Sequence, residues 1–340
     1  MSIPAPVEAN SETPFSDFDV FAPESGASFS DRARRLKQSG LLDHKSPSET
    51  AIAMREIAVR DLSLARLYEG HFNARTLIET YGDQALQTQT GELLGVWGAE
   101  APTPVRETDG ALVGQKRFAS GLGFVDRAIV TGETPDGQQL YLVSAQDTDR
   151  HDPAAWDMAG MQESRSGGFD CAGLEPQRLG QPGDFQREPL FLGGTWRIAA
   201  VTLGGIIGLL DRAADGLRAS DRLDAEAQLL RLGPVAGRAV ALWPAVIEAG
   251  AIASGPTGRA APEDAATRSL ALRLETEELA QVAVSAVERS VGLALFAAEH
   301  PTGRAARDLA CYIRQAARDA FQIRTAKAFL SGPLSNWLDR

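Results

Sequence analysis

The residue types that most often carry out chemistry are few in this 340-residue chain. The four histidines and two cysteines show no spacing typical of metal ligands, and we interpret His71 and His300 as structural or exposed side chains. The sequence has no Gly-x-Ser-x-Gly turn and no phosphate-binding loop, and its Gly204-Gly205 pair with Gly208 lies inside a predicted helix. We therefore predict neither a metal site nor a dinucleotide-binding loop.

Composition excludes several classes of function. The formal net charge of −11 argues against binding of nucleic acid or of an anionic membrane, because both usually require a basic face. Two cysteines are too few for a disulfide framework, and residues 1–21 lack the basic start and apolar run of a secretory signal. We therefore expect a cytoplasmic protein.

One central segment, residues 91–144, has the pattern of β-structure. Short runs rich in Val, Leu, Phe and Tyr are interrupted by Asp109-Gly110 and Asp136-Gly137. Asp-Gly pairs supply the positive backbone angles of tight hairpin turns, so two hairpins are predicted. The Gly-rich segment 156–181 is expected to complete this small β domain.

Helical patterns lie on both sides of the β segment. Residues 1–28 are polar and aperiodic and are predicted to form a mobile tail. A short helix is expected over 30–38, and Ser46 and Glu49 form a capping box at the start of the next helix. A further helix is expected to end at Gly82.

The C-terminal half is predicted to be a helical bundle. Its apolar run 198–210 is too short for a membrane span, and its glycines favour close helix packing. A last helix over about 304–330 carries an apolar stripe that includes Ala316. The predicted fold is α+β and mostly α, with a tail (1–28), an α domain (29–90), a β domain (91–190) and a bundle (191–340).

This plan resembles that of the acyl-CoA dehydrogenase superfamily, and four segments resemble its motifs. They are residues 55–74 (a D-x-S-x-A helix), 110–132 (G-x-L-x-G-x-K-x-W-I-T-N), 158–183 (G-M-x-x-T-x-S) and 300–321 (P-x-x-R-x-x-R-D). Together they cover most of residues 50–330.

The resemblance implies FAD bound between the β domain and the bundle, in a dimer or tetramer. The flavin would meet Trp97, Gly98 and Ala99 on one strand and Phe118, Ala119 and Ser120 on the other. Ser120 stands where the family has a Thr that donates to the reactive flavin nitrogen. Arg231, in a faint echo of the family's R-x-x-F-G segment, would pair with the FAD pyrophosphate.

The sequence departs from the family at the catalytic base. In many members a Glu lies eight residues beyond the R-D pair, and Ala316 occupies that position here. Asp319 is the nearest replacement carboxylate, and Glu288 or Glu299 could act from another helix. The family's glycine-rich segments after Trp97 and before the final helices are also absent.

Three functions remain open. The first is an FAD-dependent oxidoreductase that acts on the CH–CH group of an acyl thioester or related substrate, with an electron-transfer partner. The second is a flavin-dependent monooxygenase of the same superfamily, which receives reduced flavin from a reductase and lacks the usual Glu. The third is a non-catalytic family member that acts as a structural or partner subunit.

Overall fold

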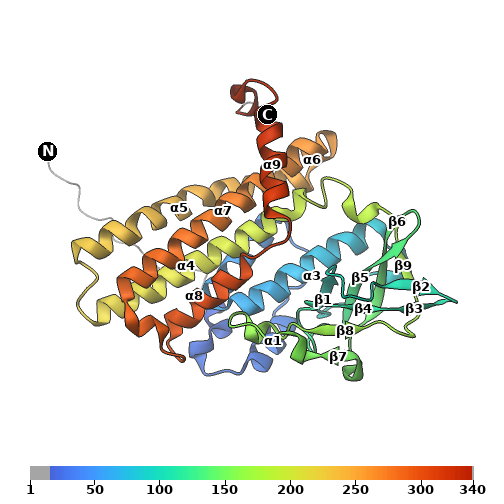
Figure 1. Cartoon of the computed structure of the whole chain (residues 1–340), viewed down its shortest axis with the longest axis horizontal. Coiled ribbons are helices and arrows are strands. Elements are labelled where there is room, and N and C mark those ends of the chain that lie inside the picture. The colour runs from blue at the N-terminus through green and yellow to red at the C-terminus, as the bar shows by residue number, and fades with distance from the viewer. Residues whose placement is uncertain (1–15, 339–340) are drawn as a thin grey trace.

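The computed structural model describes residues 16–338, and these form three parts in the predicted order (Figure 1). Helices α1 (Phe29–Gln38), α2 (Pro47–Arg60) and α3 (Leu62–Tyr81) come first. A β region follows over 94–179. Six helices complete the chain: α4 (Trp196–Ala219), α5 (Glu226–Ser254), α6 (Pro256–Ala260), α7 (Pro262–Val291), α8 (Pro301–Tyr312) and α9 (Arg318–Phe329).

Local signals position the first helices as predicted. Ser46 and Glu49 form the full capping box of α2, and Gly82 caps the end of α3. The predicted tail is wrong for residues 16–28, because Ser16–Phe21 and Pro23–Ser25 are 3₁₀ helices and Phe21 is buried in the core. The remaining tail residues, 1–15, lie outside the described part of the chain.

The β region contains three small sheets. The largest has the strand order β1 (Leu94–Trp97), β5 (Arg127–Thr134), β6 (Gly137–Ser144) and β9 (Gln177–Leu179), with only β1 and β5 parallel. The other two are β2 (Arg106–Thr108) with β3 (Ala111–Val113), and β4 (Gln115–Lys116) with β8 (Gly168–Asp170) and β7 (His151–Asp152).

Both predicted hairpins are present. Asp109 and Gly110 take positive φ angles of 53° and 80° between β2 and β3, as a two-residue turn of the primed type requires. The second hairpin joins β5 to β6 through Pro135 and Asp136, with Thr134 opposite Gly137. This turn is centred one residue earlier than the Asp-Gly pair that signalled it.

Helix α3 is attached to the main sheet through a buried histidine. The His71 ring lies 2.9 Å (Nε2) from the Leu42 carbonyl oxygen, and its Nδ1 accepts the Leu94 N–H at 3.2 Å. Burial lowers the pKa of His71 to about 4, so the ring is neutral at neutral pH. The predicted structural role of His71 is confirmed.

Helix α4 is the central helix of the bundle and packs closely on α2. A Cβ atom on Gly204 would lie 2.5 Å from the Arg55 carbonyl oxygen, and one on Gly208 would lie 2.2 Å from that of Val59. The expectation of close helix packing at these glycines is confirmed.

Two helices, α4 and α5, are long and apolar enough to cross a membrane by length and composition alone. The apolar window of α4 is 78% buried inside the protein, which identifies it as a core helix, whereas that of α5 is only 28% buried.

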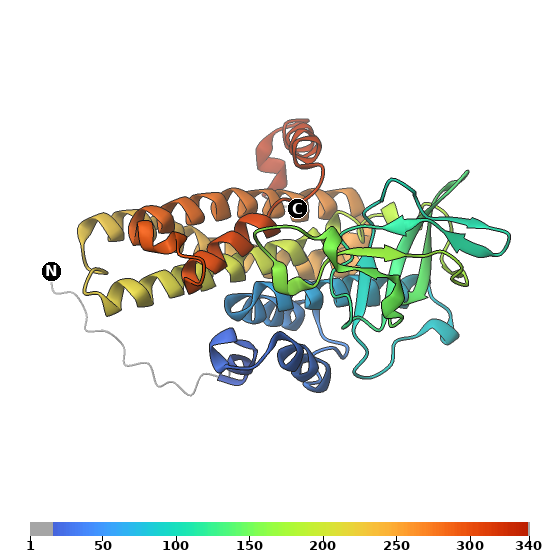
Figure 2. The same cartoon turned by 60° about the horizontal axis from the view of Figure 1, so that its bottom comes forward.

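The predicted last helix is wrong beyond Ile313. The chain turns at 313–317, where Ala317 has a φ of 58°. Helix α9 then projects from the bundle instead of running along it (Figures 1 and 2), and it is held to α7 by ion pairs of Arg318 and Arg324 with Glu278 and Glu263. Leu309 and Ile313 are buried, but Ala316 is exposed and Ile323 is 57% exposed. The predicted apolar stripe is not continuous, because its second half belongs to a separate helix.

Candidate functional site

The two segments implied to contact flavin lie side by side. The Arg117 N–H donates to the Ala99 carbonyl oxygen at 3.1 Å, and the Trp97 indole N–H donates to the Ser120 carbonyl oxygen at 3.0 Å. We call residues 97–99 and 118–120 the β wall. All six residues inferred from the resemblance are therefore brought together, although their role as flavin contacts is a matter for proposal.

The aromatic side chains of the β wall differ in accessibility. Trp97 is 1% exposed and packs on Phe169, with ring centroids 4.8 Å apart. Its ring is therefore part of the buried core behind the β wall. Phe118 is 37% exposed, with the Arg117 guanidinium 4.5 Å over its ring and Trp156 against it edge-on at 5.7 Å. Phe118 is the ring that a planar ligand could contact.

The hydroxyl of Ser120 ends a chain of three serines. Ser164 donates its single proton to the Met161 carbonyl oxygen at 2.6 Å, so Ser166 must donate to Ser164 at 2.9 Å. Ser120 must then donate to Ser166 at 3.0 Å. Toward a ligand Ser120 therefore offers an acceptor oxygen, whereas the resemblance led us to expect a donor.

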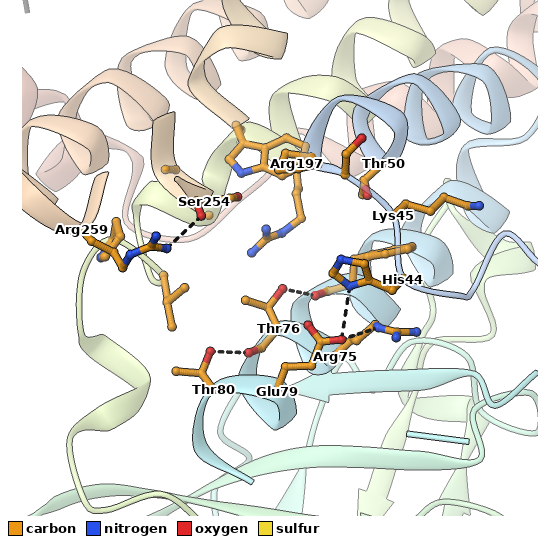
Figure 3. Close-up of a pocket in the computed structure, with 18 of the residues that line it drawn as sticks. His44, Lys45, Thr50, Arg75, Thr76, Glu79, Thr80, Arg197, Ser254 and Arg259 are labelled. Carbon is orange, nitrogen blue, oxygen red and sulfur yellow. Dashed lines mark hydrogen bonds and ion pairs between the residues drawn. The ribbon is translucent and has the colours of Figure 1, made fainter. Parts of the chain in front are cut away.

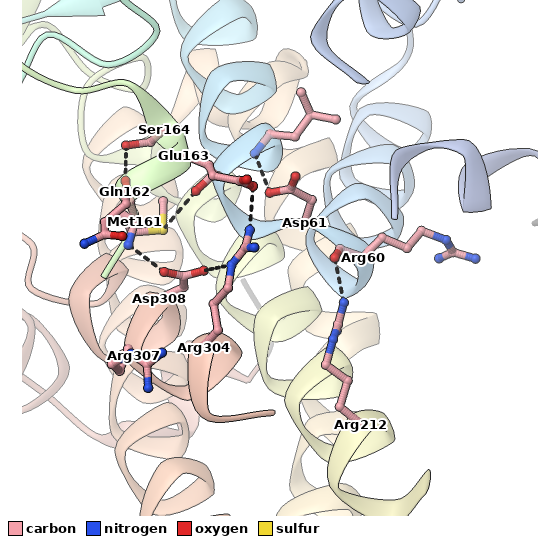
Figure 4. A network of polar contacts seen from close by, with 12 residues as sticks. Arg60, Asp61, Met161, Gln162, Glu163, Ser164, Arg212, Arg304, Arg307 and Asp308 are labelled. Atoms are coloured by element: carbon pink, nitrogen blue, oxygen red, sulfur yellow. Dashed lines mark hydrogen bonds and ion pairs between the residues drawn. The ribbon is translucent and has the colours of Figure 1, made fainter. Parts of the chain in front are cut away.

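This serine chain is fixed to the bundle by charged contacts (Figure 4). Asp308 of α8 accepts the Met161 N–H at 2.6 Å. The Glu163 carboxylate forms ion pairs with Arg304 of α8 and, at 2.7 Å, with Arg32 of α1. Burial raises the pKa of Asp308 to about 6. The G-M and R-D segments of the sequence thus meet in space.

A row of polar side chains on α3, of which Glu69 is buried and Arg66 and Asn73 are partly buried, leads away from the β wall. Arg66 donates to Glu69 at 2.7 Å, Asn73 also donates to Glu69, and Arg197 of α4 donates to Asn73 at 2.6 Å. We call Arg66, Glu69 and Asn73 the α3 polar row. Our sequence reasoning missed it, although polar residues at helical spacing within an otherwise apolar helix are a readable signal.

The α3 polar row begins at the β wall. Arg66 and Gly70 share a cavity of about 10 Å³ with Trp97 and Ser120, space for about one water molecule. At Glu69 the row faces α8, where burial, followed by the charge of Glu69, raises the pKa of Tyr312. The Tyr312 hydroxyl is buried and has no hydrogen-bond partner within residues 16–338.

The position of the usual catalytic Glu carries no carboxylate. Ala316 lies in the exposed turn between α8 and α9, where its carbonyl oxygen accepts from Arg273 at 3.2 Å. The Asp319 side chain is 95% exposed and lies 3.9 Å from Arg318. Its role as a base stays a prediction that this exposure does not support. Glu69 is a buried carboxylate that Arg66 holds, and Arg66 lines the small cavity beside Trp97.

Arg231 lies apart from the β wall. The first turns of α5, to which Arg231 belongs, lie at the end of the bundle remote from the sheets (Figure 1). Arg231 donates to the Arg289 carbonyl oxygen at 3.0 Å. Its predicted contact with a pyrophosphate would therefore have to be made with another subunit's ligand.

A larger pocket of about 590 Å³ lies at the far end of the α3 polar row (Figure 3). Helices α2 and α3, the segment 187–197 and the ends of α5 and α6 enclose it. We call it the α4 pocket, because Trp196 and Arg197 at the start of α4 line it. No group of three or more metal-binding side chains occurs among residues 16–338.

The residues of the β wall fit a flavin ring. Phe118 offers a half-exposed ring, Gly98 has open space beside it, and the Trp156 indole N–H is buried without a partner in the described structure. A planar heteroaromatic ring with acceptor atoms at its edge matches this combination of ring, space and free donor.

Comparison with solved structures agrees with the predicted fold. No family model and no curated protein matches the sequence. Dibenzothiophene monooxygenase TdsC from Paenibacillus sp. A11-2 is similar at 18% identity with a TM-score of 0.76, over 93% of this chain and 95% of that chain. Butyryl-CoA dehydrogenase from Megasphaera elsdenii is similar at 16% identity and TM-score 0.76, over 95% and 100%. A nitrososynthase from Micromonospora carbonacea var. africana is similar at 17% identity with a TM-score of 0.71, over 92% of this chain and 93% of that chain.

Proposed function

Since this chain has the acyl-CoA dehydrogenase fold, we propose that it is a flavin-dependent oxidoreductase whose flavin lies against the β wall. The observation that carries the proposal is the conjunction of Phe118, Ser120 and the free Trp156 N–H in one place. The TdsC structures with bound FMN support a flavin in this fold. A bound flavin would supply two-electron redox chemistry.

Oxygen-dependent chemistry with reduced flavin is favoured by the Ser120 hydroxyl. Oxidised flavin has a lone pair at its reactive ring nitrogen, whereas reduced flavin carries an N–H there. Because the serine chain leaves Ser120 with an acceptor oxygen, Ser120 matches the reduced form. The absence of a carboxylate at Ala316 agrees with a monooxygenase, whose reduced flavin, FMN or FAD, would come from a separate reductase.

Dehydrogenation of an acyl thioester by bound FAD is the second candidate, and Glu69 is the observation that favours it. Removal of an α-proton requires a positioned base. Glu69 is 4% exposed and is held by Asn73 and by Arg66, which shares a small cavity with Trp97 and Ser120. In this reaction Glu69, rather than Asp319, would accept the proton.

We also propose that the protein is a homo-oligomer. Leu229, Leu230 and Val240 of α5 are 51%, 76% and 75% exposed, and Leu293 and Phe296 after α7 are 88% and 63% exposed. Apolar side chains gathered on an unpartnered helix face usually mark a protein contact. Contact through α5 would bring Arg231 to a second subunit.

Oxygen consumption and the visible spectrum test these functions together. Purified protein is titrated anaerobically with reduced FMN and FAD, oxygen is then admitted, and an acyl-CoA is added to a separate FAD-loaded sample. Oxygen consumption supports the monooxygenase, and bleaching of yellow protein by the acyl-CoA supports the dehydrogenase. If the protein binds neither FMN nor FAD in either redox state, both the monooxygenase and the dehydrogenase functions are rejected.

A further inference from the structure

The α4 pocket contains a buried guanidinium, that of Arg197, which forms no salt bridge among the described residues, although the charge of Glu69 raises its pKa against the effect of burial. Arg197 is 7% exposed, and its only described hydrogen bond runs from Nε to Asn73, which leaves both terminal nitrogens available. Burial lowers the pKa of Arg197 to about 10, so it stays charged at neutral pH. A buried charge of this kind is costly unless an anion or water compensates it.

Local sequence keeps this guanidinium in place. A Cβ atom on Gly194 would lie 2.7 Å from Nη2 of Arg197, so the glycine leaves room for the side chain. The guanidinium carbon lies 5.1 Å over the Trp196 ring, and the Trp196 indole N–H is buried without a partner in residues 16–338. Trp196 and Arg197 therefore both line the pocket, and each has a donor without a described partner.

The surrounding charge is also positive, in a chain whose net charge is −11. Four further cationic side chains line the pocket against two carboxylates: Lys45, Arg75, Arg187 and Arg259 against Glu79 and Glu188. Burial raises the pKa of Glu188, and its carboxylate accepts the N–H groups of residues 192 and 193. Figure 3 shows Arg197 directed into the pocket, with Arg259 and Thr76 on other sides of it.

The lining also has apolar side chains, including Phe72, Pro189, Leu190 and Ala253, among hydroxyl groups such as those of Thr76 and Ser254. A volume of about 590 Å³ lies within the range typical of small-molecule sites. We propose that the α4 pocket binds a small amphipathic anion, whose carboxylate or phosphate pairs with Arg197 and whose apolar part contacts Phe72 and Leu190. A guanidinium binds either anion through paired donors.

The α3 polar row connects this pocket to the β wall through Asn73, Glu69 and Arg66. Anion binding at this pocket does not depend on flavin, so it can be tested separately from the proposed flavin function.

Titration calorimetry with flavin-free protein tests the binding. Hexanoate is compared with hexanamide, which has the same chain without the charge. We expect hexanoate to bind at least tenfold more tightly, and Arg197→Met to lower its affinity at least tenfold while hexanamide is unaffected. Arg218→Gln, which changes an exposed arginine at the opposite end of α4 from the pocket, should bind hexanoate like the wild type.

Arg259→Gln provides a second test, because Arg259 is exposed and its loss should not affect folding. We expect a severalfold loss of hexanoate affinity in this variant. Equal binding of the two probes, no binding of hexanoate, or unchanged hexanoate affinity in folded Arg197→Met protein would overturn the proposal. A positive result without flavin binding would reject the flavin function alone.

Discussion

At the scale of single residues, direction of hydrogen bonding decides which form of the flavin suits this protein. The chain of Ser164, Ser166 and Ser120 assigns every proton because a carbonyl oxygen at its end can only accept. Sequence shows that Ser120 replaces a threonine, but not where its proton goes. The partners of that proton come from a segment more than 40 residues away.

Two serine variants test this assignment. Ser120→Ala removes the acceptor, so its affinity for reduced flavin should fall about three- to tenfold, the range for one hydrogen bond, with little effect on oxidised flavin. Ser166→Ala frees the Ser120 proton and should shift the preference toward oxidised flavin. Anaerobic fluorescence titration of both redox forms measures this. Equal effects of Ser120→Ala on the two forms would reject the assignment.

The raised pKa of Asp308 predicts a pH dependence of stability. Its ordinary pKa is 3.8 and its folded value is about 6. Between these pH values the folded protein binds more protons than the unfolded chain, so this group's stabilising contribution is present below pH 3.8 and is lost as the pH rises through 6.

Asp308→Asn removes that titration but keeps an oxygen that accepts the Met161 N–H. From pH 4 to pH 7 the variant should gain stability relative to wild type, on the order of 2 kcal/mol. Urea unfolding at several pH values measures the difference. A constant difference across this range would contradict the raised pKa.

At the scale of elements, local chemistry makes much of the fold predictable. Four local features have the structure that their residue types predict: the Ser46 capping box, the end of α3 at Gly82, the Asp109-Gly110 turn and the close packing at the glycines of α4. The apolar stripe through Ala316 misled because helical spacing does not reveal a break. That break at 313–317 leaves the position of the usual base exposed.

Prediction of the site is limited in the same way, because local sequence signals do not reveal contacts between distant segments. The β wall could be predicted because residues 118–120 lie in a segment that resembles a family motif, and the family's plan implied residues 97–99 as the neighbouring strand. The α3 polar row and the α4 pocket could not, since they depend on Arg197 reaching α3 from 124 residues away. Such contacts follow from helix packing rather than from local pattern.

Glycine substitutions in α4 test the packing on α2. Gly208→Ala should destabilise the protein by about 1–3 kcal/mol, because the added methyl group would overlap the carbonyl oxygen of Val59. Gly216 lies on the same helix with open space around it, so Gly216→Ala should stabilise by up to about 1 kcal/mol through helix propensity. Chemical unfolding compares them, and equal effects would contradict the close contact.

At the scale of the whole molecule, the exposed face of α5 predicts self-association. Replacement of Val240, which is 75% exposed, by Glu places a charge in the proposed contact without disturbing the core. Wild type should elute as a dimer or tetramer in size-exclusion chromatography with light scattering, and Val240→Glu should shift toward monomer. A monomeric wild-type protein would remove the oligomer and the cross-subunit role of Arg231.

Flavin binding at the β wall is the central claim, and anaerobic titration with FMN and FAD in both redox states tests it most directly. We predict saturable binding of one flavin per chain, weakened about tenfold by Phe118→Ala, since stacking on an aromatic ring contributes about 1–3 kcal/mol. Leu334→Ala, which removes an exposed apolar side chain after α9, should bind like wild type. No saturable binding of any form, or equal affinity in Phe118→Ala, would contradict the account.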